Sequence, residues 1–105
     1  MAGKNTPPDD RIHSVRLIWT LPAANDRKGI REYIAQDNPA AALALDELLS
    51  EKAGRLVDNP ALGRTGRVSG TRELVAHQNY ILIYDVTDDC VRVLRVLHAA
   101  REWPC

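Results

Sequence analysis

The sequence lacks phenylalanine altogether and holds only two tryptophans and three tyrosines among its 105 residues. Hydrophobic residues still make up 45% of the chain, so the core must be built mainly from leucine, isoleucine, valine and alanine. A chain of this length forms one domain, because there is too little apolar material for two cores. A domain this small is only marginally stable alone.

An excess of charge of either sign is also missing. Fourteen basic side chains balance fourteen acidic ones, and the formal net charge is zero. This balance excludes the strong overall positive field that general nucleic-acid binders use. If the protein touches RNA, the contact must be local.

Long apolar runs are absent as well. Residues 1–10 are polar, so no secretory signal is predicted, and no stretch approaches transmembrane length. We therefore expect a cytoplasmic protein that makes no contact with membranes and whose Cys90 and Cys105 are reduced thiols. The spacing of these cysteines matches no metal motif, and we expect no metal or cofactor. We interpret residues 1–12 as a flexible tail and residues 13–105 as the folded domain.

The first half of the chain predicts one strand followed by two helices. Val15–Thr20 is short, β-branched and aromatic, which is typical of a strand. Helical spacing of apolar residues predicts a helix from about Pro22 to Gln36. A second helix is expected from Pro39, with Asn38 as its cap, and Asn59–Pro60 ends it. Its predicted core stripe is Ala41, Leu45, Leu48, Leu49, Ala53 and Leu56.

The second half predicts a loop and three more strands. Pro60–Gly70 contains three glycines, two arginines and no periodicity, and a loop of this length is more often functional than merely connecting. The strands, separated by short polar turns, are Arg72–His77, Tyr80–Thr87 and Val91–Leu97. The order β-α-α-β-β-β predicts an α+β fold, with a helical hairpin packed on a small, twisted, mainly antiparallel sheet.

Seven local strings in this order resemble the RelE/ParE superfamily of bacterial toxins, over most of the chain. The strings are the opening strand with Trp19, Ile30-x-x-Tyr33-Ile34, Asn38-Pro39-Ala40-Ala41, Gly63-Arg64-x-Gly66-Arg67, Gly70-Thr71-Arg72-Glu73-Leu74, Tyr80-x-x-x-Tyr84 and Arg95-Val96-Leu97-His98. The resemblance implies the toxin of a type II toxin–antitoxin module, which inhibits bacterial growth and is neutralised by a cognate antitoxin. It also implies contact with operator DNA only through that antitoxin.

The superfamily has two chemistries, and the resemblance leaves both open. RelE-like members are metal-independent endoribonucleases that cut mRNA on the ribosome, whereas ParE-like members poison DNA gyrase. The ribonucleases carry a phosphate-stabilising arginine directly after the position of Tyr80, and this chain has Ile81 there. An aliphatic side chain cannot supply that contact, so the gyrase branch is favoured. A third reading is an inactivated relative that only binds an antitoxin or regulates its operon.

A metal-independent ribonuclease needs a base, a cation for the phosphorane charge, and an acid for the leaving oxygen. The candidate base or acid is His98, and the candidate cations are Arg72 and Arg101. Tyr84 or Glu102 would support them. The structural alternative for His98 is a histidine at a strand end that is hydrogen-bonded to a neighbouring loop.

Two further groups of residues are candidates for binding. Arg64 and Arg67 could hold a phosphate together with exposed loop amides, although the loop matches no nucleotide-binding motif. The alternative is a solvated connecting loop. Trp103 could stack on a nucleobase, and its alternative is packing of the chain end against the sheet.

The mixed surface of the helices suits docking of an antitoxin. Arg27 and Leu43 are the residues that we assign to this surface, with a solvated face as the alternative. Arg95 is expected to be a surface or antitoxin-facing charge, and His13 and His77 ordinary surface groups.

Overall fold

The computed structural model describes residues 15–100. The predicted flexible tail, residues 1–12, lies outside this range, as do residues 101–105. Seven elements follow one another along the chain. They are β1 (Arg16–Trp19), α1 (Leu21–Ala35), α2 (Pro39–Asp58), β2 (Arg64–Thr65), β3 (Arg72–His77), β4 (Tyr80–Thr87) and β5 (Cys90–His98).

The two helices begin where short polar side chains cap them. The hydroxyl of Thr20 accepts a hydrogen bond from the backbone N–H of Ala23, and Oδ1 of Asn38 accepts one from Ala41. Each helix also carries a proline in its first turn, where a missing N–H costs nothing. Because Thr20 is the cap, α1 begins one residue earlier than predicted. It also ends one residue earlier, at Ala35. Neither helix has the length and apolar character needed to cross a membrane.

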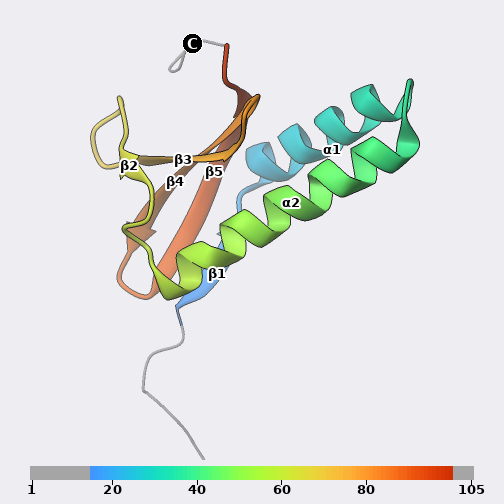
Figure 1. The fold of residues 1–105 in the computed structure, drawn as a ribbon. Helices are drawn as coiled ribbons and strands as arrows, with labels where there is room; N and C mark the ends of the chain where they lie inside the picture. The colour runs from blue at the N-terminus through green and yellow to red at the C-terminus, as the bar shows by residue number, and fades with distance from the viewer. Residues whose placement is uncertain (1–14, 101–105) are drawn as a thin grey trace, which may run out of the picture.

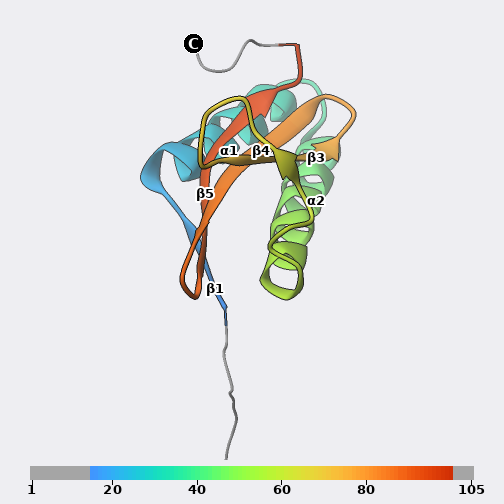
Figure 2. The same ribbon diagram turned by 90° about the vertical axis from the view of Figure 1, so that its left-hand side faces the viewer.

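The strands form one sheet in the order β1-β5-β4-β3-β2. β1 pairs with β5 in parallel, and the other pairs are antiparallel. Figure 1 shows α1 and α2 side by side as a helical hairpin, and Figure 2 shows strands of the sheet in front of α1. The predicted α+β fold is thereby confirmed.

One strand was not predicted. Within the loop between α2 and β3, Arg64 pairs with Glu73 and Thr65 with Arg72 in antiparallel register. Two residues are too few to show a period of two in the sequence, so the segment could be recognised only by its partner. The sheet therefore has five strands instead of four.

The main core lies between the helical hairpin and the sheet. Leu45, Leu49 and Ala53 of α2 pack there with Leu82 and other buried residues of the strands. The predicted stripe of α2 is wrong at one position, because the structure buries Ala42 and exposes Ala41. Residues 40–42 are all alanine, so the sequence offered no difference in polarity to choose between them.

A smaller apolar cluster lies on the other face of the sheet. Ile81, Ile83 and Leu97 form it, and all three are buried. Neighbouring strand residues point to opposite faces, so Ile81 and Ile83 point away from the helices while Leu82 points toward them. In β5 the register shifts opposite Ile83 and Tyr84, which leaves Leu94 as an extra residue. Such a bulge bends the strand locally.

Candidate functional site

A groove opens between α1 and the adjoining ends of β4 and β5, and it encloses about 450 Å³. Tyr33 of α1 lines one side and is 72% exposed. Tyr80 and His98 line the other side, with their rings edge to face and 5.3 Å between centroids. Gly29 leaves its part of the wall open, because nothing lies within 4 Å of where a Cβ would be. The groove can therefore accept an aromatic or aliphatic side chain or a base.

His98 has one nitrogen engaged. The backbone N–H of Ala100 donates to its Nδ1 over 3.1 Å. A ring nitrogen that accepts a hydrogen bond carries no proton, so neutral His98 holds its proton on Nε2. In this state His98 can donate a hydrogen bond through Nε2 but has no free basic nitrogen. The arrangement matches the structural alternative for His98, a strand-end histidine bonded to the following loop.

Tyr84 and Arg72 brace the loop before β3. The Tyr84 hydroxyl donates to the carbonyl oxygen of Pro60 over 2.7 Å and accepts from the N–H of Gly63 over 2.8 Å. Nη1 of Arg72 donates to the carbonyl oxygen of Gly63 over 2.7 Å. Tyr84 is completely buried, so a catalytic role for its hydroxyl would require the loop to open. Burial raises the pKa of Tyr84 above 10.0, against the opposing effects of the Gly63 hydrogen bond and the charge of Arg72.

The structure does not gather the candidate nuclease residues. His98 faces Tyr80 across the strands, whereas Arg72 faces Tyr84. The two partner positions lie four residues apart along β4, which is about 13 Å at the rise of a strand. His98 and Arg72 also lie on strands that are not neighbours, so the structure does not bring the two residues together. The remaining candidates of this kind, Arg101, Glu102 and Trp103, lie outside the described residues.

Ile81 stands at the position to which the resemblance assigns the arginine of the ribonucleases. It is 7% exposed and packs with Ile83 and Leu97 on the face of the sheet away from the helices. Replacing Ile81 by a charged side chain would bury that charge among aliphatic groups. This part of the sheet is therefore built for apolar packing.

The two loop arginines share one buried carboxylate. Nη2 of Arg64 lies 3.3 Å from Oε1 of Glu73, and Nε of Arg67 lies 3.4 Å from Oε2. The backbone N–H of Arg67 also donates to Oε2 over 3.1 Å. Burial raises the pKa of Glu73, but the hydrogen bonds from Arg67 and Arg64 outweigh it and hold that pKa below 4.5. Sequence reasoning missed Glu73, because a strand residue and a loop charge nine positions earlier show no recognisable spacing.

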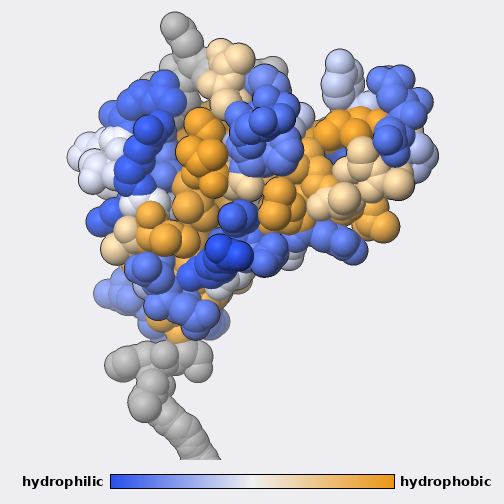
Figure 3. All heavy atoms as spheres, viewed as in Figure 1, coloured by the Kyte–Doolittle hydropathy of each residue, from blue (hydrophilic) through white to orange (hydrophobic). Residues whose placement is uncertain are grey.

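The residues assigned to antitoxin docking differ in their exposure. Arg27 binds Asp46 through Nε and Nη2, each at 3.0 Å, and its guanidinium lies 4.3 Å from the ring centre of Trp19. These contacts tie α1 to α2 and β1. Leu43, in contrast, is 57% exposed on α2. Figure 3 shows apolar patches separated by hydrophilic residues on the face that carries α2.

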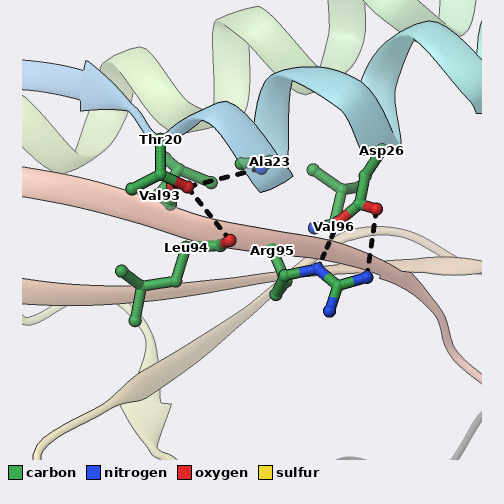
Figure 4. A network of polar contacts seen from close by, with 7 residues as sticks. All are labelled: Thr20, Ala23, Asp26, Val93, Leu94, Arg95 and Val96. Atoms are coloured by element: carbon green, nitrogen blue, oxygen red, sulfur yellow. Dashed lines mark hydrogen bonds and ion pairs between the residues drawn. The ribbon is translucent and has the colours of Figure 1, made fainter.

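Arg95 is tied to α1. Its Nε and Nη2 donate to the carboxylate of Asp26 over 2.7 and 3.1 Å, and the backbone N–H of Val96 donates to the same carboxylate (Figure 4). The Thr20 hydroxyl lies 2.9 Å from the carbonyl oxygen of Val93. Beyond the end of β1, side chains of α1 and its cap therefore replace a neighbouring strand along β5. The expectation of a surface charge missed this pairing, since Asp26 lies 69 residues earlier.

Among residues 15–100, no three histidine, cysteine, aspartate or glutamate side chains gather as a group that could hold a metal ion. Cys90 is a buried free thiol. Cys105 and His13 lie outside the described range.

Known proteins with the same fold were found by sequence and by structure. Residues 17–103 match the family described as the ParE toxin of the type II toxin–antitoxin system parDE. A putative toxin, Y4kP, of Sinorhizobium fredii is 40% identical over 85% of this chain and 93% of its own length. Toxin RelE2 of Caulobacter vibrioides is 37% identical over 82% of this chain and 97% of its own. A solved chain of the chromosomal ParDE system from P. aeruginosa is 28% identical with a TM-score of 0.72, covering 82% of this chain and 97% of that one. The chain belongs to the ParE family of type II toxins, within the RelE/ParE superfamily.

Proposed function

We propose that this toxin arrests bacterial growth by binding DNA gyrase, the action of ParE-like toxins. The observation that carries the proposal is Ile81, buried with Ile83 and Leu97 at the position of the ribonucleases' arginine. Loss of one preorganised contact to a developing charge costs on the order of 100-fold to 1000-fold in rate. A binding inhibitor has no such requirement, because it stabilises no transition state.

The state of His98 supports the same choice. Its Nδ1 accepts the Ala100 N–H, so the neutral ring has no lone pair free to take a proton from a 2′-hydroxyl. Arg72, the candidate cation among the described residues, donates to the Gly63 carbonyl and pairs with Tyr84, four positions along β4 from the partner of His98. A gyrase-binding toxin needs neither residue for proton transfer.

Ribosome-dependent cleavage of mRNA is the second candidate. His98 is exposed beside Tyr80 in an open groove, where its Nε2–H can donate a hydrogen bond to a phosphate oxygen. One relative, 37% identical, is named as a RelE toxin. This candidate requires a cation from another position to reach the phosphate beside His98, because Ile81 carries no charge.

A cognate antitoxin is the proposed partner in either case, and the protein is proposed to act in the cytoplasm. Support comes from the ParDE toxin–antitoxin system with which this chain shares its fold. Leu21, Tyr33 and Leu43 are 73%, 72% and 57% exposed on the helical hairpin, and large apolar side chains in such positions suit burial by a partner helix. We expect nanomolar affinity or better, about −12 kcal/mol, measured by calorimetry.

The test is induction of the toxin alone, with plasmid supercoiling and transcript ends followed together. The informative variant is His98→Ala. The matched control is His77→Ala, because His77 likewise accepts a backbone N–H on Nδ1, from Asn79. Antitoxin binding checks the folding of both variants.

If gyrase is the target, supercoiling changes and both folded variants remain toxic. If His98 is a general acid or base, its loss lowers cleavage by about 100-fold to 10,000-fold, while His77→Ala cuts normally. New transcript ends that vanish in folded His98→Ala would overturn the gyrase proposal. A parent chain that binds its antitoxin but affects neither process would instead be an inactivated relative.

A further inference from the structure

The loop before β3 carries charged side chains of one sign only. Residues 59–72 contain Arg64, Arg67 and Arg72 and no acidic residue. Glu73 is the acid in contact with the loop, and it is 2% exposed. The surface of the loop is therefore cationic even though the whole chain carries no net charge.

The buried carboxylate of Glu73 contacts Arg64 and Arg67. It engages Nη2 of Arg64 and Nε of Arg67, and within residues 15–100 the other guanidinium nitrogens of both arginines have no hydrogen-bond partner. The side chains of Arg64 and Arg67 are 66% and 50% exposed. Both guanidinium groups contact the same carboxylate, so they lie within a few ångströms of each other and present their remaining donors to solvent.

The backbone that carries these arginines is held in place. Gly63 is fixed by Tyr84 and Arg72 through its N–H and carbonyl oxygen. The N–H of Gly66 donates to the carbonyl oxygen of Thr71 over 2.8 Å. A Cβ at Gly66 would lie 2.3 Å from Oγ1 of Thr71, so only glycine fits this close approach. Such a loop loses little conformational freedom when an anion binds.

We propose that Arg64 and Arg67, positioned by Glu73, form a binding site for a phosphodiester group of a nucleic-acid backbone. Arg64, Arg67 and Glu73 together carry one net positive charge, which balances the single negative charge of a phosphodiester. Each of the two non-bridging oxygens of the phosphodiester can accept a hydrogen bond from one guanidinium group. Thr65, Ser69 and Gly70, the exposed neighbours of the arginines, are small and allow close approach of a backbone. This site goes beyond the proposed function, because it does not depend on which cellular target is inhibited.

The experiment measures binding of the full chain to a short fluorescein-labelled DNA duplex, and to a single-stranded RNA of equal length, by anisotropy at low ionic strength. Arg64→Gln with Arg67→Gln should weaken binding by about 10-fold to 100-fold and reduce the salt slope by about one. The matched control is Arg55→Gln with Arg92→Gln. It also removes two exposed arginines that pair with carboxylates, and it should change affinity by less than about 2-fold.

A second variant controls for misfolding of the double arginine variant. Removing both loop arginines leaves the Glu73 carboxylate buried without a counter-charge, whereas adding Glu73→Gln leaves no such charge. The triple variant should fold and bind as weakly as the double variant. The nucleic acid whose binding is weakened in the double variant is the source of the phosphodiester. An equal loss of affinity in the control variant would overturn the proposal. So would a parent chain that binds neither nucleic acid, or one that binds only an acidic peptide through Arg64.

Discussion

Replacing Tyr84 by phenylalanine should destabilise the fold strongly, although the change removes a single oxygen atom. The hydroxyl makes two hydrogen bonds, to the Pro60 carbonyl and from the Gly63 N–H. Each bond contributes about 1 kcal/mol net, and leaving the buried Gly63 N–H unsatisfied adds about 1–3 kcal/mol. The expected loss is therefore about 3–5 kcal/mol, or on the order of 12–40 °C in Tm for a domain of this size.

Urea and thermal unfolding followed by circular dichroism would measure this loss. Tyr33→Phe is the matched control, because Tyr33 is 72% exposed and its loss should stay within about 0.5 kcal/mol. A Tyr84→Phe variant as stable as the parent would show that the Tyr84 hydroxyl does not hold the loop. Residues 59–72 would then not be held rigid through Tyr84 either.

The same phenol predicts an alkaline limit to stability. Its pKa is raised in the folded state by burial, so the folded protein keeps the proton more tightly than the unfolded chain. That contribution is fully present below pH about 10 and is lost as pH rises through the folded pKa. Tyr84→Phe should lack this part of the alkaline decline, which unfolding measured across a pH series would detect.

Three further predictions concern acid stability, packing and thiols. The depressed pKa of Glu73 contributes stability above pH 4.5 that is lost as pH falls through the folded pKa, so Glu73→Gln should flatten the acid limb of a urea-midpoint series. An unchanged acid limb would refute the role of the arginines in that shift. Gly63→Ala should cost about 1–3 kcal/mol in unfolding experiments, because its Cβ would lie 2.7 Å from Cε1 of Tyr84, whereas Gly29→Ala, with open space around it, should not destabilise. Thiol titration of denatured protein should find two reactive groups per chain, Cys90 and Cys105, and finding none would contradict the reduced state.

Elements with strong local signals were predictable from the sequence. Asn38 and Pro39 form a cap and first turn that depend only on neighbouring residues, and α2 begins where they predict. The hairpin strands β3, β4 and β5 likewise follow from local alternation and polar turns, with β5 one residue longer at each end than predicted. β2 was missed because its two residues become a strand only through pairing with β3.

The candidate site was less predictable, because its contacts join residues far apart in the chain. His98 and Arg72 could be named from the chemistry that they offer, but their separation along β4 appears only in the strand register. Asp26 is 69 residues from Arg95, and no sequence pattern links them. Burial also decides roles that residue type leaves open, as the enclosed hydroxyl of Tyr84 shows.

The parallel pairing of β1 with β5 has a consequence for the order of folding. β1 lies at the edge of the sheet and pairs with no other strand, and the contact between Thr20 and Val93 spans 73 positions. Closing a loop of that length costs on the order of 4 kcal/mol in chain entropy. Asp26 depends on β5 as well, since its hydrogen bonds go to Arg95 and Val96. On the ribosome, a nascent chain without β5 leaves β1 unpaired and α1 without these anchors. The surface formed by α1, β1 and β5 should therefore assemble only after nearly the whole domain has been synthesised. An antitoxin that is already present can then bind the toxin as it folds.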